Sequence, residues 1–185
     1  MRIDRIRQAY NVDIQFVQFP LHPETPLEGK PLEALFNTGP DEIAQKNAHM
    51  KGLMEAEGLP YGRRTHTYNS RKAQELAKWA ETQDNGQSIH DALFRAYFVD
   101  TQNVADKGVL LSVCKNLGLD VDAAASAIDG DTYKDAVDAD WKKSREYGVT
   151  GVPTYVAGQA GIVGAQPYEA IEQLLQQSGV TQRGG

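Results

Sequence analysis

Apolar residues recur at helical spacing in three consecutive stretches in the middle of the chain. Positions three and four residues apart lie on one face of an α-helix, so each stretch predicts an amphipathic helix that packs by one face. The apolar positions are Ala73, Leu76, Ala77 and Ala80 in the first stretch, Ile89, Leu93, Ala96 and Tyr97 in the second, and Leu110, Val113, Cys114 and Leu117 in the third. The sequence therefore predicts a helical subdomain in this region.

The same spacing predicts helices towards both ends of the chain. Ile3, Ile6 and Tyr10 share one face of a helix over residues 1–10. A longer helix over residues 133–147 stops at Gly148, because glycine adopts the left-handed conformation of a helix C-terminus without steric cost. Two further helices are predicted, one capped by Asp120 or Asp122 and ending at Ile128, the other opening at Pro167.

Two regions have the composition of β-structure. Residues 12–19, VDIQFVQF, place apolar side chains on both faces, which is typical of a strand inside a sheet. Residues 154–157 and 160–163 flank Gly158-Gln159, a pair that suits a two-residue type II′ turn and predicts a hairpin. The five prolines of residues 20–40 predict an ordered surface loop, since each removes a backbone donor.

Several separated motifs resemble one known family, in that family's order. The string GVTGVPTYV, the hairpin that follows it and GAQPYEAIEQLL resemble the C-terminal third of DsbA-like thioredoxin-fold oxidoreductases, in their FrnE-like branch. RIRQAYNVDIQFVQFPLHPETP is similar to the end of that family's first helix and its second strand. NSRKAQELAKWA, HDALFRAYFVD and GLDVDAAA are similar to its helical insertion.

The resemblance implies an α/β, thioredoxin-like fold. It implies one domain over residues 1–185, with a helical insertion at residues 40–131. In the family, the first strand is central in the sheet and leads to a CxxC motif, and both precede the residues that resemble Arg2 to Tyr10. Neither is present here, so we expect a native protein that starts upstream of Met1 and a sheet that lacks its central strand.

The resemblance also implies a substrate-binding loop. In the family, the proline of the GVPTYV motif follows a cis peptide bond and faces the active-site cysteines. This assigns substrate binding to Gly151, Val152, Pro153 and Thr154, with the backbone at Val152 pairing with an extended substrate peptide. No catalytic residue is identified by the sequence, which leaves open whether this chain is itself an enzyme.

The chain contains a single cysteine, Cys114, and so has no internal dithiol couple. Cys114 lies on the apolar stripe of a predicted helix, where burial raises the pKa of a thiol and hides it from solvent. The sequence therefore favours a core cysteine, and it predicts a family member of the protein disulfide isomerase type that is redox-inactive by itself.

Other chemistry finds no support in the sequence. The four histidines, His22, His49, His66 and His90, have no metal-ligand spacing, so no metal site is predicted, and His90 is expected at a helix start or on the surface. No nucleotide-binding or serine hydrolase motif is present, and no cofactor is expected.

Two other functions remain open at this point. Glutathione-dependent enzymes of the 2-hydroxychromene-2-carboxylate isomerase and kappa transferase types share the fold and the proline loop. A non-catalytic binding or dimerisation module would keep the loop without the thiols. A serine in place of the missing cysteine would favour the glutathione branch, so the feature that separates these functions lies outside this sequence.

Charge and hydropathy limit the partners. The net charge of −6 gives no reason to expect nucleic acid or an anionic membrane as partner. No apolar run is long enough to cross a bilayer, and the first residues lack the apolar core of a signal peptide, so a cytoplasmic protein is expected. Its partners are expected to be a thiol or disulfide substrate and, because a sheet without its central strand exposes backbone groups, further copies of itself.

Overall fold

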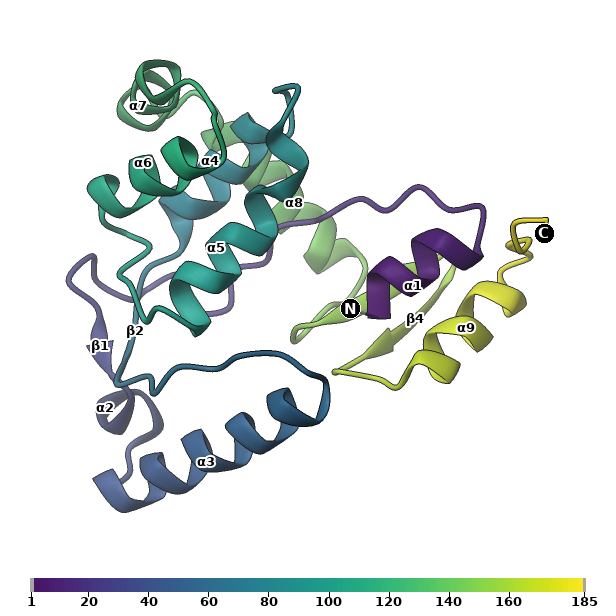
Figure 1. Ribbon diagram of the computed structural model, residues 1–185, viewed down its shortest axis with the longest axis horizontal. Helices are drawn as coiled ribbons and strands as arrows, with labels where there is room; N and C mark the ends of the chain where they lie inside the picture. Colours follow the sequence, from purple (N-terminus) through teal and green to yellow (C-terminus); the bar gives the residue numbers. More distant parts are fainter. Residues whose placement is uncertain (1, 185) are drawn as a thin grey trace. The chain divides into compact units, whose positions relative to one another are not determined.

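The computed structural model describes residues 2–184, which divide into two compact units. One unit combines the residues up to Leu21 with those from Asp140 onwards, and the other is His22–Ala139. The first contains a β-hairpin with helices and is called the α/β unit. The second is called the helical unit. Figure 1 labels the elements of both.

The helical unit is built almost entirely of helices. Its main helices are α3 (Pro40–Ala56), α4 (Arg71–Ala80), α5 (Ile89–Phe98), α6 (Lys107–Asn116) and α7 (Val121–Asp129). Shorter elements are α2 (Leu32–Phe36), the 3₁₀ turn η1 (Gly86–Ser88), and the two-residue strands β1 (Lys30–Pro31) and β2 (His66–Thr67), which pair antiparallel. The helix α8 (Lys134–Glu146) begins in this unit and ends in the α/β unit.

The apolar stripes predicted for the middle of the chain form the core of the helical unit. Helices α4, α5, α6 and α7 contact one another and bury Leu76, Ile89, Leu110 and Cys114 almost completely. Asp106 caps α6, and Asp120 caps α7 by accepting hydrogen bonds from two backbone N–H groups. The predicted packing of these helices is therefore confirmed, and so is a cap at Asp120, whereas the cap at Asp106 was not predicted.

The α/β unit consists of α1 (Arg2–Ala9), the hairpin of β3 (Thr154–Ala157) and β4 (Ala160–Val163), and α9 (Tyr168–Gln177). The strands pair in the predicted register, and Gly158 opens their turn with φ +59°. Helix α9 packs on both strands, as Figure 1 shows. The small core of this unit consists of Ile6, Tyr10, Ile171 and Leu175, with half-buried residues around them.

The two ends of the α/β unit are held together at Tyr10. Its ring is fully buried, and its hydroxyl donates to Glu172 Oε1 at 2.8 Å. Its backbone forms an isolated antiparallel bridge with Gln182, and its carbonyl accepts a 2.9 Å hydrogen bond from Arg183 Nε. Tyr10 thus joins the helix at the start of the chain to the segment that follows α9.

The strand predicted for residues 12–19 is wrong. Residues 11–20 have no regular secondary structure and none of them lies in a strand, although their side chains alternate between exposed and half-buried from Asn11 to Val17. The reason is that a strand exists only when another strand pairs with it, and no other strand among the described residues lies beside this segment. The alternation of residue types was recognised correctly, but the pairing was absent.

Two smaller predictions also need correction. The proline-rich loop of residues 20–40 contains β1 and α2, so part of it has regular structure. Pro167 is the N-cap of α9 and not its first helical residue, which shifts the predicted helix start by one position.

Candidate functional site

The proline loop lies between the end of α8 and the start of β3. Helix α8 ends at Glu146, and Gly148 follows with φ +66°, as predicted for the residue after a helix. The backbone N–H groups of Gly148 and Val149 donate to the carbonyls of Arg145 and Ser144, both at 2.9 Å. These bonds close the helix end and fix the direction in which the loop leaves it.

The four residues assigned to substrate binding are consecutive and lie in the loop and at its junction with β3. The Val152–Pro153 peptide bond is cis. Thr154 donates from Oγ1 to the carbonyl of Gly151 at 2.7 Å, which ties the two sides of the proline together. The Val152 side chain is 49% exposed and Pro153 is also exposed. The loop therefore presents an apolar surface and its backbone to solvent.

The pairing of β3 with β4 decides which backbone groups of β3 remain available. The carbonyl of Pro153 accepts a hydrogen bond from Gly164 N at 2.8 Å, so residue 153 faces β4. Because backbone groups alternate in direction along a strand, residues 155 and 157 also face β4, whereas Thr154 and Val156 face away. No other strand among the described residues pairs with that outer edge. Thr154 and Val156 form this edge, called here the free edge of β3, and Val152 lies in the loop that precedes it.

Sequence reasoning found Val152 and Thr154 but missed Val156. Its backbone faces the same way as that of Thr154, and its side chain is 45% exposed. The signal was available, because the period of two along a strand places residues 154 and 156 on one side. The site residues assigned from the resemblance were only those directly around the proline, so they did not include Val156.

The site contains no thiol. Cys114 lies in α6, in the core of the helical unit, and is fully buried. Burial raises the pKa of the Cys114 thiol to about 11, so that almost none of it is thiolate at neutral pH. The prediction of a structural core cysteine is confirmed.

The titratable residues offer no metal centre in the described part of the chain, where no group of three or more histidine, cysteine or acidic side chains is arranged to hold an ion. His90 is at the start of α5, as expected, but it is buried and its Nε2 lies 2.9 Å from Glu81 Oε1. Of the two positions expected for His90, the helix start is therefore the one found, and the side chain is not on the surface. None of the described helices is long and apolar enough to cross a membrane.

Comparisons with solved structures agree with this architecture. A probable DsbA oxidoreductase from Streptomyces coelicolor is 26% identical and superposes with a TM-score of 0.87, covering 96% of this chain and 81% of that one. A 2-hydroxychromene-2-carboxylate isomerase is 18% identical with a TM-score of 0.72, covering 96% and 85% of the two chains. The predicted α/β, thioredoxin-like fold is confirmed by these neighbours.

The comparisons of sequence agree as well. The uncharacterized protein YwbO of Bacillus subtilis is 29% identical over 98 residues, which span 52% of this chain and only about half, 49%, of that protein. The family model of the DSBA-like thioredoxin domain matches residues 1–176. Because that match runs through the proline loop, the hairpin and nearly all of α9, this chain belongs to the DSBA-like thioredoxin domain family.

Proposed function

We propose that the chain binds an extended segment of a thiol- or disulfide-containing substrate protein along the free edge of β3, as the substrate-binding part of a thiol-disulfide oxidoreductase. The observation that carries this proposal is the pair of outward-facing backbone positions at Thr154 and Val156, which directly follow the proline loop. Membership of a DsbA-like family supports a thiol or disulfide as the chemical class of substrate.

The free edge suits a peptide better than a compact ligand. An extended peptide that adds to a sheet edge gains main-chain hydrogen bonds, and its alternate side chains meet the side chains of the edge strand. Val152 and Val156 are both close to half exposed, and they flank the half-buried Thr154. A bound peptide therefore meets one apolar side chain on each side of a polar position.

The chain is proposed to bind substrate without exchanging disulfides by its own residues. In thiol-disulfide exchange, a thiolate attacks one sulfur of a disulfide, the other sulfur leaves as a thiolate, and a second protein thiol then resolves the mixed disulfide. The sequence contains one cysteine, and its thiol is buried with a raised pKa. Catalysis would need cysteines supplied by another part of the protein or by a partner.

Peptide binding at the free edge can be tested with proline substitutions on the two sides of the hairpin. Val156→Pro removes an N–H that faces outward from β3, and Val163→Pro removes one that faces outward from β4. Amide exchange of Thr154 and Val156 in the wild-type chain is expected to slow when a reduced, unfolded insulin B chain is added. Val156→Pro is expected to abolish binding of that peptide.

The Val163→Pro variant is the matched control, because it changes the same hairpin at its opposite edge. It should bind the peptide as the wild type does. Equal loss of binding in both variants, or unchanged exchange at Thr154 in the wild type, would contradict binding at the free edge of β3.

Absence of intrinsic redox activity has its own test. Reduction of insulin by dithiothreitol should proceed at the same rate with the wild-type chain, with a Cys114→Ala variant and without protein. Turnover by the wild type that disappears in Cys114→Ala would show that the buried thiol becomes accessible and reactive.

The glutathione-dependent isomerase function remains the alternative proposal, and it rests on a likeness of fold. The isomerase of similar fold is 18% identical, and the family match carries the oxidoreductase class. Titration with glutathione, followed by the amide shifts of residues 151–154, separates the two functions. Saturable shifts with glutathione but none with the peptide would favour the isomerase type, and binding of neither would favour a dimerisation module.

We further propose a cytoplasmic protein that self-associates. A second copy would pair with residues 11–20, which no strand of the described chain pairs with, and would leave the free edge of β3 to the substrate. Sedimentation velocity at low micromolar concentration should give a species of about twice the 20.3 kDa monomer mass. A single well-folded 20.3 kDa species would rule self-association out at that concentration.

A further inference from the structure

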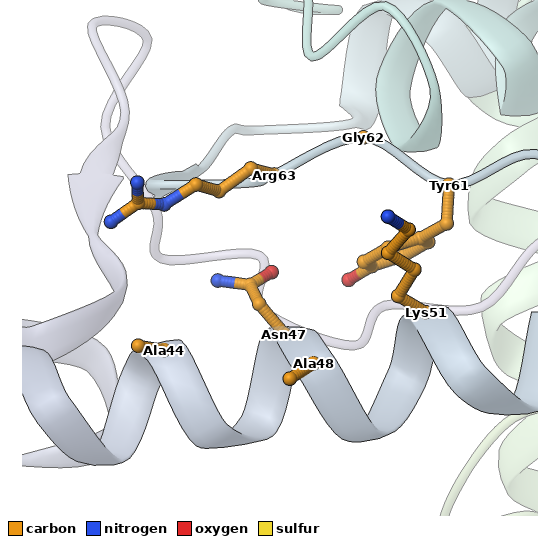
Figure 2. Close-up of a pocket in the computed structure, with 7 residues that line it drawn as sticks. All are labelled: Ala44, Asn47, Ala48, Lys51, Tyr61, Gly62 and Arg63. Carbon is orange, nitrogen blue, oxygen red and sulfur yellow. The ribbon is translucent and has the colours of Figure 1, made fainter.

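The helical unit contains a cavity of about 300 Å³ between helix α3 and the segment that follows it. Figure 2 shows its lining: Ala44, Asn47, Ala48 and Lys51 from the helix, and Tyr61, Gly62 and Arg63 from the segment. The helix residues are spaced by three and four positions, so they belong to one face of α3. A volume of this size is at the lower end of what small-molecule sites occupy.

Both walls of the cavity are held in place. The Nδ2 group of Asn47 donates to the carbonyl of Arg64 at 2.9 Å, which links the helix to the segment. The N–H of Gly62 donates to the carbonyl of Phe98 at 2.8 Å. A Cβ atom at Gly62 would lie 2.1 Å from the carbonyl oxygen of Val99, so only glycine fits this close approach. The cavity is therefore part of the fold, with small alanine side chains as its floor.

Several polar groups of the lining can still form hydrogen bonds or ion pairs with a ligand. No hydrogen bond or ion pair in the described part of the chain involves the Arg63 guanidinium or the Tyr61 hydroxyl. The carboxamide of Asn47 uses its Nδ2 group, and its oxygen has no donor among the described residues. Among the described residues, Lys51 has only an exposed ion pair with Glu55, at 3.6 Å, and such pairs are weak.

The charges in the lining have one sign. Lys51 and Arg63 are cationic, and no carboxylate belongs to the lining, although the whole chain carries a net charge of −6. Figure 2 shows the Arg63 guanidinium directed towards the Ala44 end of the helix face, with Lys51 and Tyr61 at the opposite end and Asn47 between them. The two cations thus stand at the two ends of the cavity, with the Asn47 carboxamide and the Ala48 side chain between them.

From this arrangement we infer that the cavity binds an elongated organic dicarboxylate. One carboxylate pairs with the Arg63 guanidinium, which offers two parallel N–H donors, and the other meets the Lys51 ammonium and the Tyr61 hydroxyl. The carbon chain between them lies over Ala44 and Ala48. This site uses only residues of the helical unit and does not depend on the function proposed for the free edge of β3.

Three probes of equal chain length separate the contributions of charge and chain. Adipate has a carboxylate at each end, hexanoate has one, and 1,6-hexanediol has none. At neutral pH and low ionic strength, adipate is expected to bind with a dissociation constant on the order of 1 mM, given its few heavy atoms. Hexanoate should bind about tenfold more weakly because it loses one charged contact, and hexanediol should not bind measurably.

Amide chemical shifts locate the binding, and substitutions test the two cations. Adipate should shift the amides of Ala44, Asn47 and Gly62. Arg63→Gln and Lys51→Gln should each weaken adipate binding by about tenfold. Lys46→Gln is the matched control, because Lys46 is a cation of the same helix that pairs with Glu42 and does not line the cavity.

A fourth variant tests the cavity without changing charge. Ala48→Leu fills the floor of the cavity at an exposed helix position, so it should abolish adipate binding while the circular dichroism of the chain stays unchanged. Equal affinity for adipate and hexanoate would overturn the proposal. So would equal weakening by Lys46→Gln and Lys51→Gln, or adipate binding that survives in Ala48→Leu.

Discussion

The helical unit and the α/β unit differ in the size of their apolar cores and in the pairing of their backbone groups. In the helical unit, most backbone groups pair inside helices, and apolar side chains of four helices meet in one core. In the α/β unit, the core is small, the sheet consists of two strands, and residues 11–20 belong to no strand. The core of the helical unit is assembled from its own helices, whereas the α/β unit leaves the free edge of β3 without a strand partner among the described residues.

This difference follows from the kind of pairing each structure needs. A helix satisfies its backbone from residues four positions away, so local sequence is sufficient. A strand needs a partner that is often far away in sequence, and without it the same residues remain extended but unpaired. Functional surfaces in this protein are therefore expected where pairing is incomplete, which is also where the proline loop lies.

The largest effect is expected from a core substitution in the helical unit. Leu110 is fully buried in α6, so Leu110→Ala should reduce the free energy of unfolding by about 2–5 kcal/mol through lost burial and a cavity. Urea unfolding can be followed by the fluorescence of Trp79, which lies in the same core, in a Trp141→Phe background.

The neighbouring Leu111 provides the control for this measurement. Leu111 is partly buried and packs against the core from outside. Leu111→Ala should therefore reduce the free energy of unfolding clearly less than Leu110→Ala does. Similar losses for both leucines would mean that the core of the helical unit is looser than its burial indicates.

A smaller effect is expected at the centre of the α/β unit. Tyr10→Phe keeps the buried ring and removes the hydroxyl that bonds Glu172, with Gln182 Nε2 also donating to it at 3.2 Å. The loss of these bonds should destabilise the unit by about 1–2 kcal/mol. Hydrogen exchange at Tyr155 and Ile171 measures this, because both residues belong to or pack against the same core.

Tyr147→Phe is the corresponding control, since the Tyr147 side chain is exposed and no hydrogen bond to it is present in the described chain. It should leave exchange unchanged. Faster exchange at Leu76 in Tyr10→Phe would contradict the separation of the two cores, because Leu76 belongs to the core of the helical unit.

The smallest effect concerns the ion pairs on the surface of the helical unit. Hydrogen bonds from Arg71, and then from Lys134, lower the pKa of Asp138 to about 2. A carboxyl group whose pKa is lower in the folded state adds stability above its ordinary pKa and loses that contribution as the pH falls towards the lowered value. Asp138→Asn should therefore lower the urea midpoint slightly at pH 7, by an amount that shrinks between about pH 4 and pH 2.

Asp135→Asn serves as the reference for Asp138→Asn, because Asp135 lies on the same helix without a hydrogen bond to Arg71. It should change the urea midpoint at pH 7 less than Asp138→Asn does. A midpoint difference for Asp138→Asn that is constant from pH 7 to pH 2 would show that the ion pair contributes nothing.

The helices and the hairpin could be predicted because their signals are local. The stripe through Leu110 and Cys114, the cap at Asp120 and the glycine at 148 each depend on residues within one or two turns. The hairpin needed only the turn at Gly158 and two short apolar runs. In these places, residue type and spacing contain the whole physical cause of the structure.

The remaining features depend on contacts that spacing does not encode. Residues 12–19 have the composition of a strand, but pairing decides whether they form one. The pairing of β1 with β2 joins residues more than thirty positions apart. The cavity under α3 brings Asn47 and Arg63 together without any motif. The spacing placed His90 at a helix start but did not reveal its burial beside Glu81, which lies on a different element.

The bonds around Tyr10 also constrain the order of events during synthesis. Its hydroxyl reaches Glu172 across 162 positions of sequence, and its carbonyl is bonded to a residue 173 positions away. Residues 22–139 leave the ribosome before those partners exist, so the helical unit has all its contacts while the α/β unit still waits for its second half. Helix α1 therefore remains without its core partners on a growing chain until α9 has been made, and this interval is when it is most exposed to chaperones and proteases.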